Sequence, residues 1–570
     1  MAGTEQDQRN QPGQGESMIF TDMSVCRPAS ALTRRRTGRT WQLMDYEAEG
    51  VSGTLIAAKY SSAAPPVTLP LPVEGWHRIY LGFWKPPYTD ITVRLRLTSD
   101  VAFTPITDCD DFIWDRTDVN EAFWKCADLS GQDLIIAQQS KGVARAAFVA
   151  YVRTEPMTQA ELAGLLEDRA RKDTRKVIAV VDGGSWLENK ECTTREELWE
   201  QQELFRHSDV GKIYHAVNYG STTTYPSEVG VLCAGNGEVF ESAHGQRLYN
   251  SLHALLEQDL IPFVVGMEHA HSMGLQFHVQ LRMGMGDGTW EGEGEGGFAE
   301  RHPEYRILAK DGTPLAKLSF AFPEVRRFLL DIMREVAQYD IDGINLGFIR
   351  GPLFMGYEAP LVEGFIAKYG ADPRQIDDAD PRWLAHKAEC VTQLVREAKA
   401  LIDEITQQRG RKLELSAWVY NTIFHGFDLQ TWLSERLLDA IIGVGVGKAR
   451  PGVGGHPELA KLARDVQCKL YQGTGERKPE SYIKNALEGH ENGADGFMVW
   501  DIDGPDEFPE HWEIIRNMGH PERVQAFAKQ LPKMKRKKML NVAGCDFDHT
   551  YGKGAPDNWP PEMMIFCTNG

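Results

Sequence analysis

Residues 323–350 read PEVRRFLLDIMREVAQYDIDGINLGFIR, a helical pattern followed directly by a strand pattern. In the first part, apolar side chains recur every three or four residues, which predicts an amphipathic helix over Pro323–Tyr339. Pro323 lies in its first turn, where a missing N–H costs no hydrogen bond. The second part, Gly343–Arg350, is a short apolar run, as expected of a strand covered on both faces. A helix joined closely to a buried strand is the unit of a parallel α/β fold.

The same alternation extends from this unit in both directions along the chain. A second helix is predicted over Trp383–Ile405, with Gly410 as its stop signal. Eight strand-like runs alternate with helical stretches: Val177–Asp182, Lys212–Val217, Leu275–Met283, Gly343–Arg350, Leu413–Tyr420, Leu438–Val444, Cys468–Gln472 and Gly496–Ile502. Eight such units predict a (β/α)8 TIM barrel. An open doubly wound sheet is the alternative, which the absence of a GxGxxG motif after the first run disfavours.

The pattern is different before residue 157. Residues 1–39 are predicted to be a disordered or extended segment, rich in Gln, Gly and Glu at its start. Residues 40–156 are predicted to form a jelly-roll-like β-sandwich from short strands separated by turns. Its predicted strands are Thr54–Ala58, Trp76–Phe83, Ile91–Thr98, Leu134–Gln138 and Ala146–Val152. The barrel domain is assigned to 157–518 and a C-terminal extension to 519–570, in which Leu540–Gly544 could add one strand.

The composition excludes several classes of protein. A content of 42% hydrophobic and 25% charged residues fits a globular chain, and the net charge of −19 disfavours a nucleic-acid partner. The nine cysteines form no CxxC pair, so neither a zinc ribbon nor a disulfide framework is predicted. No apolar run is long enough to cross a bilayer and no signal segment is visible. We therefore expect a cytoplasmic protein without a membrane partner, although a leader already removed would leave the same sequence; whether it forms a homo-oligomer stays open.

A TIM barrel carries its active site at its mouth, the end of the barrel where the strands finish, and this rule sorts the carboxylates. Asp342, Glu414 and Asp439 begin strands, so they are assigned to the opposite end. The carboxylates that follow strand ends are Asp182, Asp287, Glu358, Glu476, Asp501 and Asp503. Two long loops reach the same end. Gly284–Gly297 is glycine-rich and acidic, which indicates either a lid over the site or an inert insert, and Arg350–Phe365 begins with a Gly-Pro turn.

Polar and aromatic side chains accompany these carboxylates. Hydroxyl groups of a sugar need polar partners, while the C–H face of a pyranose stacks on aromatic rings. The predicted substrate-binding residues are Asp182, Asn218, Arg282, Asn345, Arg350, Tyr357, Trp418, Tyr420, Gln472 and Trp500. Trp418 and Phe348 fit a place in the core equally well. His269, His271 and His278 lack the spacing of metal ligands, so no metal and no cofactor is predicted.

One segment resembles a known family. His302–Phe365 reads HPEYRILAKDGTPLAKLSFAFPEVRRFLLDIMREVAQYDIDGINLGFIRGPLFMGYEAPLVEGF, and EHAHSMGL (Glu268–Leu275) precedes the third strand. Both resemble the bacterial glycosyl-hydrolase-like family 10 proteins, and the β-rich N-terminal segment is similar to the jelly-roll modules that accompany such barrels. The resemblance implies a TIM-barrel glycosidase with a carbohydrate substrate. Many relatives carry an aspartate after the leucine of the fourth strand; here that position is Gly347. If that aspartate is the catalytic group of the family, this chain has lost it or moved its function, and Glu358 is the replacement candidate.

The predicted reaction is hydrolysis of a glycosidic bond by two carboxylates, one acting as acid and the other as nucleophile or base. Glu358 and Asp501 are the predicted pair, with Asp503 as substitute. Trp500 beside Asp501 would desolvate it and raise its pKa, as an acid requires. Two alternatives remain: a barrel without activity that binds a glycan, which Gly347 motivates, and a lyase or metal-dependent hydrolase on the same fold.

Overall fold

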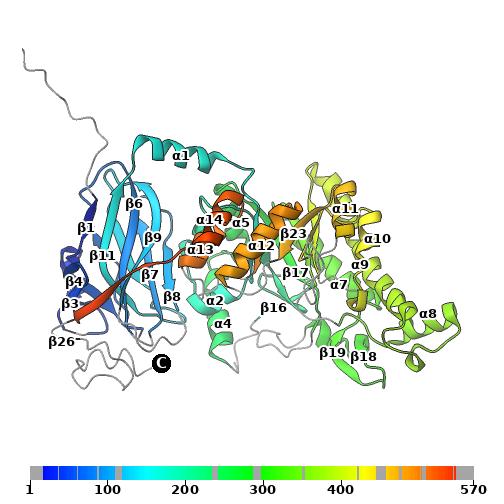
Figure 1. Cartoon of the computed structure of the whole chain (residues 1–570). Coiled ribbons are helices and arrows are strands. Elements are labelled where there is room, and N and C mark those ends of the chain that lie inside the picture. Colours follow the sequence, from blue (N-terminus) through cyan, green and yellow to red (C-terminus); the bar gives the residue numbers. More distant parts are fainter. Residues whose placement is uncertain are drawn as a thin grey trace, which may run out of the picture. The chain divides into compact units, whose positions relative to one another are not determined.

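The computed structural model places the chain in two compact units (Figure 1). The first comprises Met1–Arg171, Pro505–Trp512 and Pro532–Gly570, and the second comprises Lys172–Gly504 and Glu513–Leu531. The described residues are 17–35, 37–60, 62–86, 89–109, 118–233, 242–286, 297–348, 353–419, 423–443, 457–473, 478–500, 502, 509–542 and 545–546. The predicted domain boundaries at 156/157 and 518/519 remain predictions.

The first unit consists mainly of antiparallel strands. Its strands are β1 (Met18–Phe20), β2 (Leu32–Thr33), β3 (Trp41–Ala48), β4 (Val51–Ala58), β5 (Val67–Leu69), β6 (Trp76–Lys85), β7 (Ile91–Leu97), β8 (Thr104–Asp108), β9 (Asp118–Asp128), β10 (Leu134–Gln138), β11 (Ala147–Pro156), β25 (Lys535–Val542) and β26 (Cys545–Asp546). One sheet has the order β2-β3-β4-β11-β6-β9-β25-β26, with β1 on β11, and the other has the order β5-β10-β7-β8. Strand β25 pairs with both β9 and β3, so the C-terminal part of the chain completes this unit.

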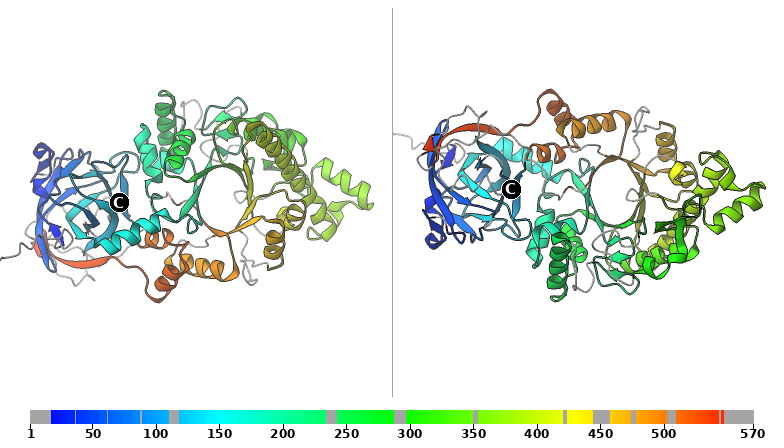
Figure 2. Two further views of the ribbon diagram at one scale, coloured as in Figure 1. Left: turned by 90° about the horizontal axis from the view of Figure 1, so that it is seen from above. Right: turned by 90° about the horizontal axis from the view of Figure 1, so that it is seen from below.

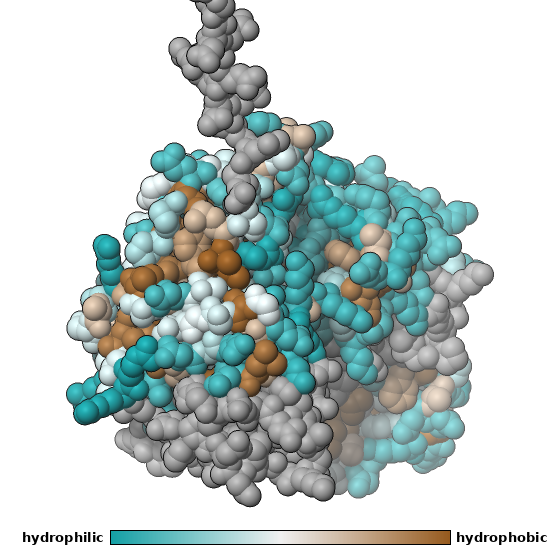
Figure 3. Space-filling model, turned by 60° about the vertical axis from the view of Figure 1, so that its left-hand side comes forward, coloured by the Kyte–Doolittle hydropathy of each residue, from teal (hydrophilic) through white to brown (hydrophobic). Residues whose placement is uncertain are grey.

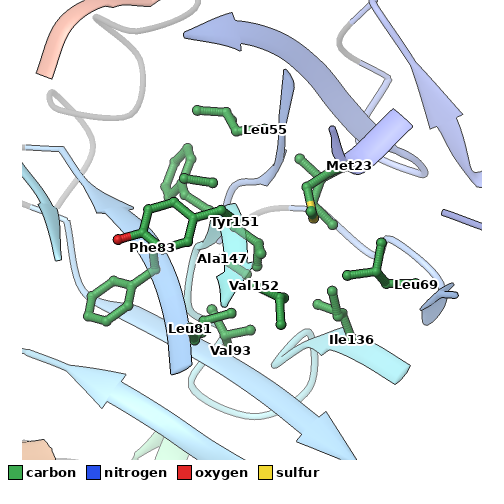
Figure 4. Close-up of a cluster of buried hydrophobic side chains, with 14 of the residues drawn as sticks. Met23, Leu55, Leu69, Leu81, Phe83, Val93, Ile136, Ala147, Tyr151 and Val152 are labelled. Carbon is green, nitrogen blue, oxygen red and sulfur yellow. The ribbon is translucent and has the colours of Figure 1, made fainter. Parts of the chain in front are cut away.

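Side chains from both sheets share one core (Figure 4). Leu81, Phe83 and Tyr151 come from the larger sheet, while Val93 and Ile136 come from the smaller one. On the molecular face drawn in Figure 3, hydrophobic side chains gather in several patches between hydrophilic ones. Helix α1 (Gln159–Ala170) follows the last strand of this part of the chain. It begins with a capping box, in which Thr158 and Glu161 satisfy each other's backbone N–H groups.

The second unit is a closed barrel of eight parallel strands, which confirms the predicted TIM barrel; Figure 2 shows it end-on as a ring of strands surrounded by helices. The strands are β12 (Val177–Val181), β13 (Val210–Ala216), β17 (Gln276–Arg282), β20 (Gly343–Gly347), β21 (Glu414–Trp418), β22 (Ala440–Ile442), β23 (Lys469–Gly473) and β24 (Gly496–Trp500). Each coincides with one predicted apolar run. Small strands in its loops are β14 (Asn218–Tyr219), β15 (Thr222–Thr223), β16 (Val231–Leu232), β18 (Arg306–Leu308) and β19 (Pro314–Leu318).

Helices follow each barrel strand. They are α2 (Ser185–Lys190), α3 (Arg195–Glu203), α4 (Ala243–Leu256), α5 (Pro262–Ser272), α6 (Phe298–Arg301), α7 (Pro323–Val336), α8 (Ala359–Tyr369), α9 (Pro381–Arg409), α10 (Leu429–Ser434), α11 (Pro457–Val466), α12 (Pro479–Asn492), α13 (Pro509–Ile515) and α14 (Pro521–Lys529). Helix α13 lies across the division between the two units. Helices α7 and α9 correspond to the two helices predicted from the sequence; α7 ends three residues before the predicted Tyr339, and α9 extends about one turn beyond the predicted Ile405. Among the described residues, no helix has the length and apolar character needed to span a membrane.

Gly410 ends α9 in the left-handed conformation, with φ of 64°. An L side chain adopts this conformation at a cost of about 1 kcal/mol, whereas asparagine tolerates it better. We expect Gly410→Ala to lower the free energy of unfolding by about 1 kcal/mol, and Gly410→Asn to lower it less. Urea denaturation of the three proteins measures this difference. Equal stability of the alanine variant and wild type would contradict the assigned role of Gly410.

The strand-start end of the barrel interior contains an ion pair rather than apolar side chains alone. Lys212 of β13 contacts Glu414 of β21 through its ammonium group, and Lys212 is 7% exposed. The fully buried His278 of β17 lies 3.8 Å from Glu414 and stacks on Tyr214 with a centroid distance of 4.8 Å. Burial lowers the pKa of His278 well below its usual value, so this imidazole is neutral at pH 7. The prediction that Glu414 faces away from the mouth agrees with this place in the fold.

Candidate active site

Three buried side chains at or just after the ends of the first three barrel strands meet at the mouth. Arg282, the last residue of β17, places Nη2 at 2.6 Å from Oδ1 of Asp182, which follows β12. The Tyr219 hydroxyl donates to the same carboxylate oxygen at 2.8 Å, and the Arg282 guanidinium lies 4.4 Å from the centre of the Tyr219 ring. Burial raises the pKa of Tyr219 well above its usual value, so the phenol remains a neutral donor. The arrangement fixes one carboxylate after β12 and one guanidinium at the end of β17, the two strands on either side of β13.

Two glycines make the close approach of these strands possible. Gly183 has φ of 83°, and a Cβ there would lie 2.1 Å from the Ala216 carbonyl oxygen. At Gly184 a Cβ would lie 2.1 Å from the Tyr219 hydroxyl. Larger residues would therefore push Tyr219 away from Asp182. The Gly-Gly pair directly after the first strand is visible in the sequence, but Tyr219 was not among the predicted substrate-binding residues.

Two tryptophans predicted to bind substrate contact each other. The rings of Trp418 and Trp500, from β21 and β24, have centroids 4.9 Å apart at an interplanar angle of 52°. Trp418 is only 7% exposed and packs into a cluster with Ile178, Tyr471 and Met498, while Trp500 is partly buried. Trp418 therefore fills the barrel interior and supports Trp500. Phe348, in contrast, is fully buried among other aromatic residues and belongs to the core.

An amide network runs across the barrel interior below the mouth. Gln280 donates through Nε2 to Asn345 at 2.9 Å, Asn345 donates to Ser416 at 2.9 Å, and Ser416 donates to the Tyr214 hydroxyl at 3.2 Å. The predicted binding residue Asn345 is therefore completely buried and bonded to its neighbours. Gln280 was not predicted as a site residue, although polar and apolar residues alternate along its strand, QFHVQLR. A Cβ at Gly347 would lie 3.2 Å from Cγ of Gln280 and 2.9 Å from the Leu281 carbonyl oxygen. Gln280 thus occupies the space beside the position where an acid was expected.

Asn218 and Gln472, two residues predicted to bind substrate, form hydrogen bonds to the protein backbone. Asn218 accepts from the Arg282 backbone N–H at 2.8 Å and donates to the Arg282 and Gly220 carbonyls at 3.1 Å each. Asn218 therefore orients Arg282. Gln472 donates to the Asn485 carbonyl in α12 at 3.1 Å, so its amide links strand and helix, and its role at the mouth stays a prediction.

Tyr357, predicted to bind substrate, contacts other side chains of the protein. Its hydroxyl donates to Asp378 at 2.5 Å and its ring stacks on Trp383 at a centroid distance of 5.1 Å. Burial raises the pKa of this phenol, and hydrogen bonding to Asp378 raises it further. Tyr357 therefore joins the loop after β20 to the start of α9.

Glu358 is held by backbone groups, which favours a structural role, and its place in the catalytic pair stays a prediction. It is 1% exposed and accepts hydrogen bonds from the backbone N–H groups of Leu308, at 3.0 Å, and of Gly356, at 2.8 Å and 3.0 Å to its two oxygens. Burial raises the pKa of Glu358, and these N–H groups oppose that rise. The carboxylate therefore anchors the β18–β19 hairpin to the start of α8. Sequence reasoning placed Glu358 in the correct loop but could not show that backbone donors occupy it.

The remaining predicted residues lie outside the described residues. They are Asp501, Asp503, Arg350 and Tyr420, together with Asp287, Glu476 and most of the glycine-rich loop. Asp501 comes one residue after β24, and β24 pairs with β12, the strand that precedes Asp182. Within the described part of the chain, no group of His, Cys, Asp and Glu side chains has the arrangement of a metal site.

The closed parallel barrel, with charged and aromatic side chains where its strands end, defines the class of protein: a (β/α)8 barrel with a polar site at its C-terminal face. Residues 177–446 match the family described as Glycosyl hydrolase-like 10, which confirms the resemblance predicted from His302–Phe365. No curated protein matches the sequence.

Among solved structures, the chain is similar to alpha-L-fucosidase isoenzyme 2 from Paenibacillus thiaminolyticus, with 16% identity, a TM-score of 0.41 and coverage of 63% of this chain and 50% of that chain. It is also similar to the catalytic domain of beta-amylase from Paenibacillus polymyxa, with 11% identity, a TM-score of 0.40 and coverage of 61% and 99%. The chain thus spans half the length of the fucosidase that it matches.

Proposed function

We propose that the protein is a glycoside hydrolase that cleaves a carbohydrate at the mouth of its barrel, with the N-terminal unit as a jelly-roll-like β-sandwich accessory domain. The observation that supports this most is the Asp182–Arg282–Tyr219 cluster beside the Trp418–Trp500 pair. A fixed carboxylate near aromatic rings, of which Trp500 is partly accessible, suits the binding of a pyranose. The match to a glycosyl hydrolase-like family supports the same class of reaction.

The proposed mechanism uses two carboxylates. Asp182 takes the part of the ionised group, base or nucleophile, because the Arg282 guanidinium favours its charged form. Asp501 takes the part of the acid that protonates the leaving oxygen, with Asp503 as the alternative, because Trp500 precedes it in the chain and would desolvate it. Glu358 has no part in this scheme, since backbone N–H groups occupy its oxygens.

A screen for release of reducing sugar from a panel of oligosaccharides tests the proposal. We expect wild type to turn over at least one of them, and Asp501→Asn to reduce that turnover by about 10²-fold, the lower range for loss of a general acid. Unchanged secondary structure by circular dichroism serves as the folding control. Near-wild-type hydrolysis by both Asp501→Asn and Asp182→Asn would contradict the proposed pair.

Glu358→Gln separates the structural from the catalytic assignment of this residue. The amide keeps one acceptor oxygen but turns an NH2 group toward backbone donors, so we expect a loss of about 1–3 kcal/mol in the free energy of unfolding. Turnover per folded molecule should stay within about threefold of wild type, because a loss of one general acid would cost at least about 10²-fold. A stable variant without turnover would restore Glu358 to the catalytic pair.

A glycan-binding barrel without turnover is the second candidate function. It is favoured by Gly347, where the space for an acid is bounded by Gln280 and the Leu281 carbonyl. Saturable binding of an oligosaccharide by calorimetry, with no product released over days, would support this function. Any turnover that Asp501→Asn removes would exclude it.

A further inference from the structure

Lys387 is a buried lysine at the end of the barrel that carries the mouth. Neither the family nor the proposed reaction explains its surroundings. Lys387 lies in the second turn of α9 and is 9% exposed. Its ammonium nitrogen is 5.6 Å from the centre of the Trp383 ring and 5.5 Å from that of the Phe424 ring. Phe424 belongs to the short helical turn Ile423–His425 that follows β21, so this cluster lies beside the loops that end β20 and β21. We call Lys387, Trp383 and Phe424 the lysine cluster.

The charge of Lys387 has no direct counter-ion among the described residues. Asp378 and Glu358 act on it electrostatically, but both are bound to other groups. Asp378 accepts from Lys310 at 2.8 Å and from Tyr357, and Glu358 accepts from backbone N–H groups. Burial lowers the pKa of the Lys387 ammonium and is the largest influence on it. Taking an ammonium out of water without a partner costs several kcal/mol. An anion that binds next to Lys387 would recover part of this free energy.

The neighbouring surface is apolar and exposed. Ile423 and Phe424 are 41% and 46% exposed. An exposed aromatic ring next to a cation can contact the C–H face of a sugar while the cation binds a charged substituent. The net charge of −19 repels long polyanions, which favours a ligand with a single carboxylate over an acidic polymer.

We propose that the lysine cluster binds the carboxylate of a uronic acid residue in a short oligosaccharide, with the Phe424 ring against the sugar. This inference rests on the proposed function, because it names the class of carbohydrate that the barrel takes. The Lys387 ammonium supplies a charge-assisted hydrogen bond to the carboxylate, and the same ligand extends toward the mouth. The cluster therefore selects for acidic over neutral sugars.

Calorimetry with two matched ligands tests this proposal: an oligosaccharide ending in glucuronate, and the same oligosaccharide ending in glucose. We expect wild type to bind the acidic ligand at least about tenfold more tightly, and the preference to shrink at high salt. Lys387→Met keeps the length of the side chain but removes the charge, and is expected to bind both ligands equally. Its affinity for the neutral ligand should match that of wild type, which a damaged fold would not give. Lys387→Arg should keep part of the preference.

Several outcomes would overturn the proposal. Equal affinities in wild type, or a preference for the acidic ligand that persists in Lys387→Met, would show that Lys387 does not recognise the carboxylate. In either case, binding or hydrolysis of the neutral ligand would leave the proposed function intact. Failure of wild type to bind either ligand would overturn this proposal alone, because the screen of oligosaccharides tests the proposed function separately. Folding is not expected to obscure the result, because replacing an unpaired buried charge by an apolar group of similar size is neutral or stabilising.

Discussion

Replacing Glu414 by leucine is expected to lower the free energy of unfolding of the barrel by about 3–5 kcal/mol at pH 7, the usual result of breaking a buried ion pair on one side. Glu414 begins β21 and contacts the ammonium group of Lys212, which is 7% exposed inside the barrel. The substitution leaves that ammonium buried without its counter-ion. His278 cannot compensate, because it is neutral and fully buried.

The pH dependence of this defect identifies the group responsible. Burial lowers the pKa of Lys212 in the folded protein, while Glu414 raises it, so losing Glu414 lowers it further. Between the folded pKa and the ordinary value of about 10.4, the unfolded chain binds more protons than the folded one, so stability rises with pH. The pH range over which stability rises is wider in Glu414→Leu than in wild type, because the folded pKa of Lys212 is lower in the variant. The difference in stability between the two proteins should therefore be smaller at pH 9.5 than at pH 7.

Urea denaturation at the two pH values measures this effect, with two control proteins. Lys212→Met/Glu414→Leu should recover much of the lost stability, since both charges are gone. Glu435→Gln removes an exposed ion pair with Arg396 and should change stability little. If the defect of Glu414→Leu were the same at pH 7 and pH 9.5, an unpaired Lys212 ammonium would not be its cause.

The barrel could be predicted from the sequence because parallel strands covered on both faces are apolar over their whole length. Ile178, Ile344 and Val499 each stand in such a run, and each lies in a barrel strand. Strand β9 was not predicted, because its polar residues are buried as partners of other residues. Glu121 in β9 forms an ion pair with Arg153 at 2.7 Å, and only 3% of its side chain is exposed. A charged residue thus occupies a buried position, so the strand does not show the usual alternation of buried apolar and exposed polar residues.

The site could be predicted only as a collection of residues. Asp182 and Arg282 were both included because each follows or ends a strand, but their ion pair depends on the closure of the barrel and on the Asn218 amide that orients Arg282. Glu358 shows the opposite situation. Its position after β20 suggested a group at the mouth. The structure instead has it accept a hydrogen bond from the backbone N–H of Leu308, which lies in a hairpin 50 residues earlier in the chain. Long-range backbone partners leave no pattern in a sequence.

Replacing Arg282 by methionine is expected to affect both stability and function. The side chain of Arg282 neutralises Asp182, which is 4% exposed, and lies against the Tyr219 ring. Without Arg282, the buried Asp182 carboxylate loses its cationic partner and keeps the hydrogen bond from the Tyr219 hydroxyl. This loss should lower the free energy of unfolding by about 3–5 kcal/mol. The same loss misplaces Asp182, so kcat/KM for the oligosaccharide found in the screen should fall by about 10³-fold.

A second substitution separates the two effects. In Arg282→Met/Asp182→Asn the buried charge is removed, so stability should return toward that of wild type while kcat/KM stays low. Arg282→Lys keeps a cation but loses the planar fork of the guanidinium, and should recover stability in part. Thermal unfolding and steady-state kinetics of the four proteins measure both quantities. If turnover returned together with stability in the double variant, Asp182 and Arg282 would be a structural pair, and the reacting carboxylates would have to come from the end of β24 alone.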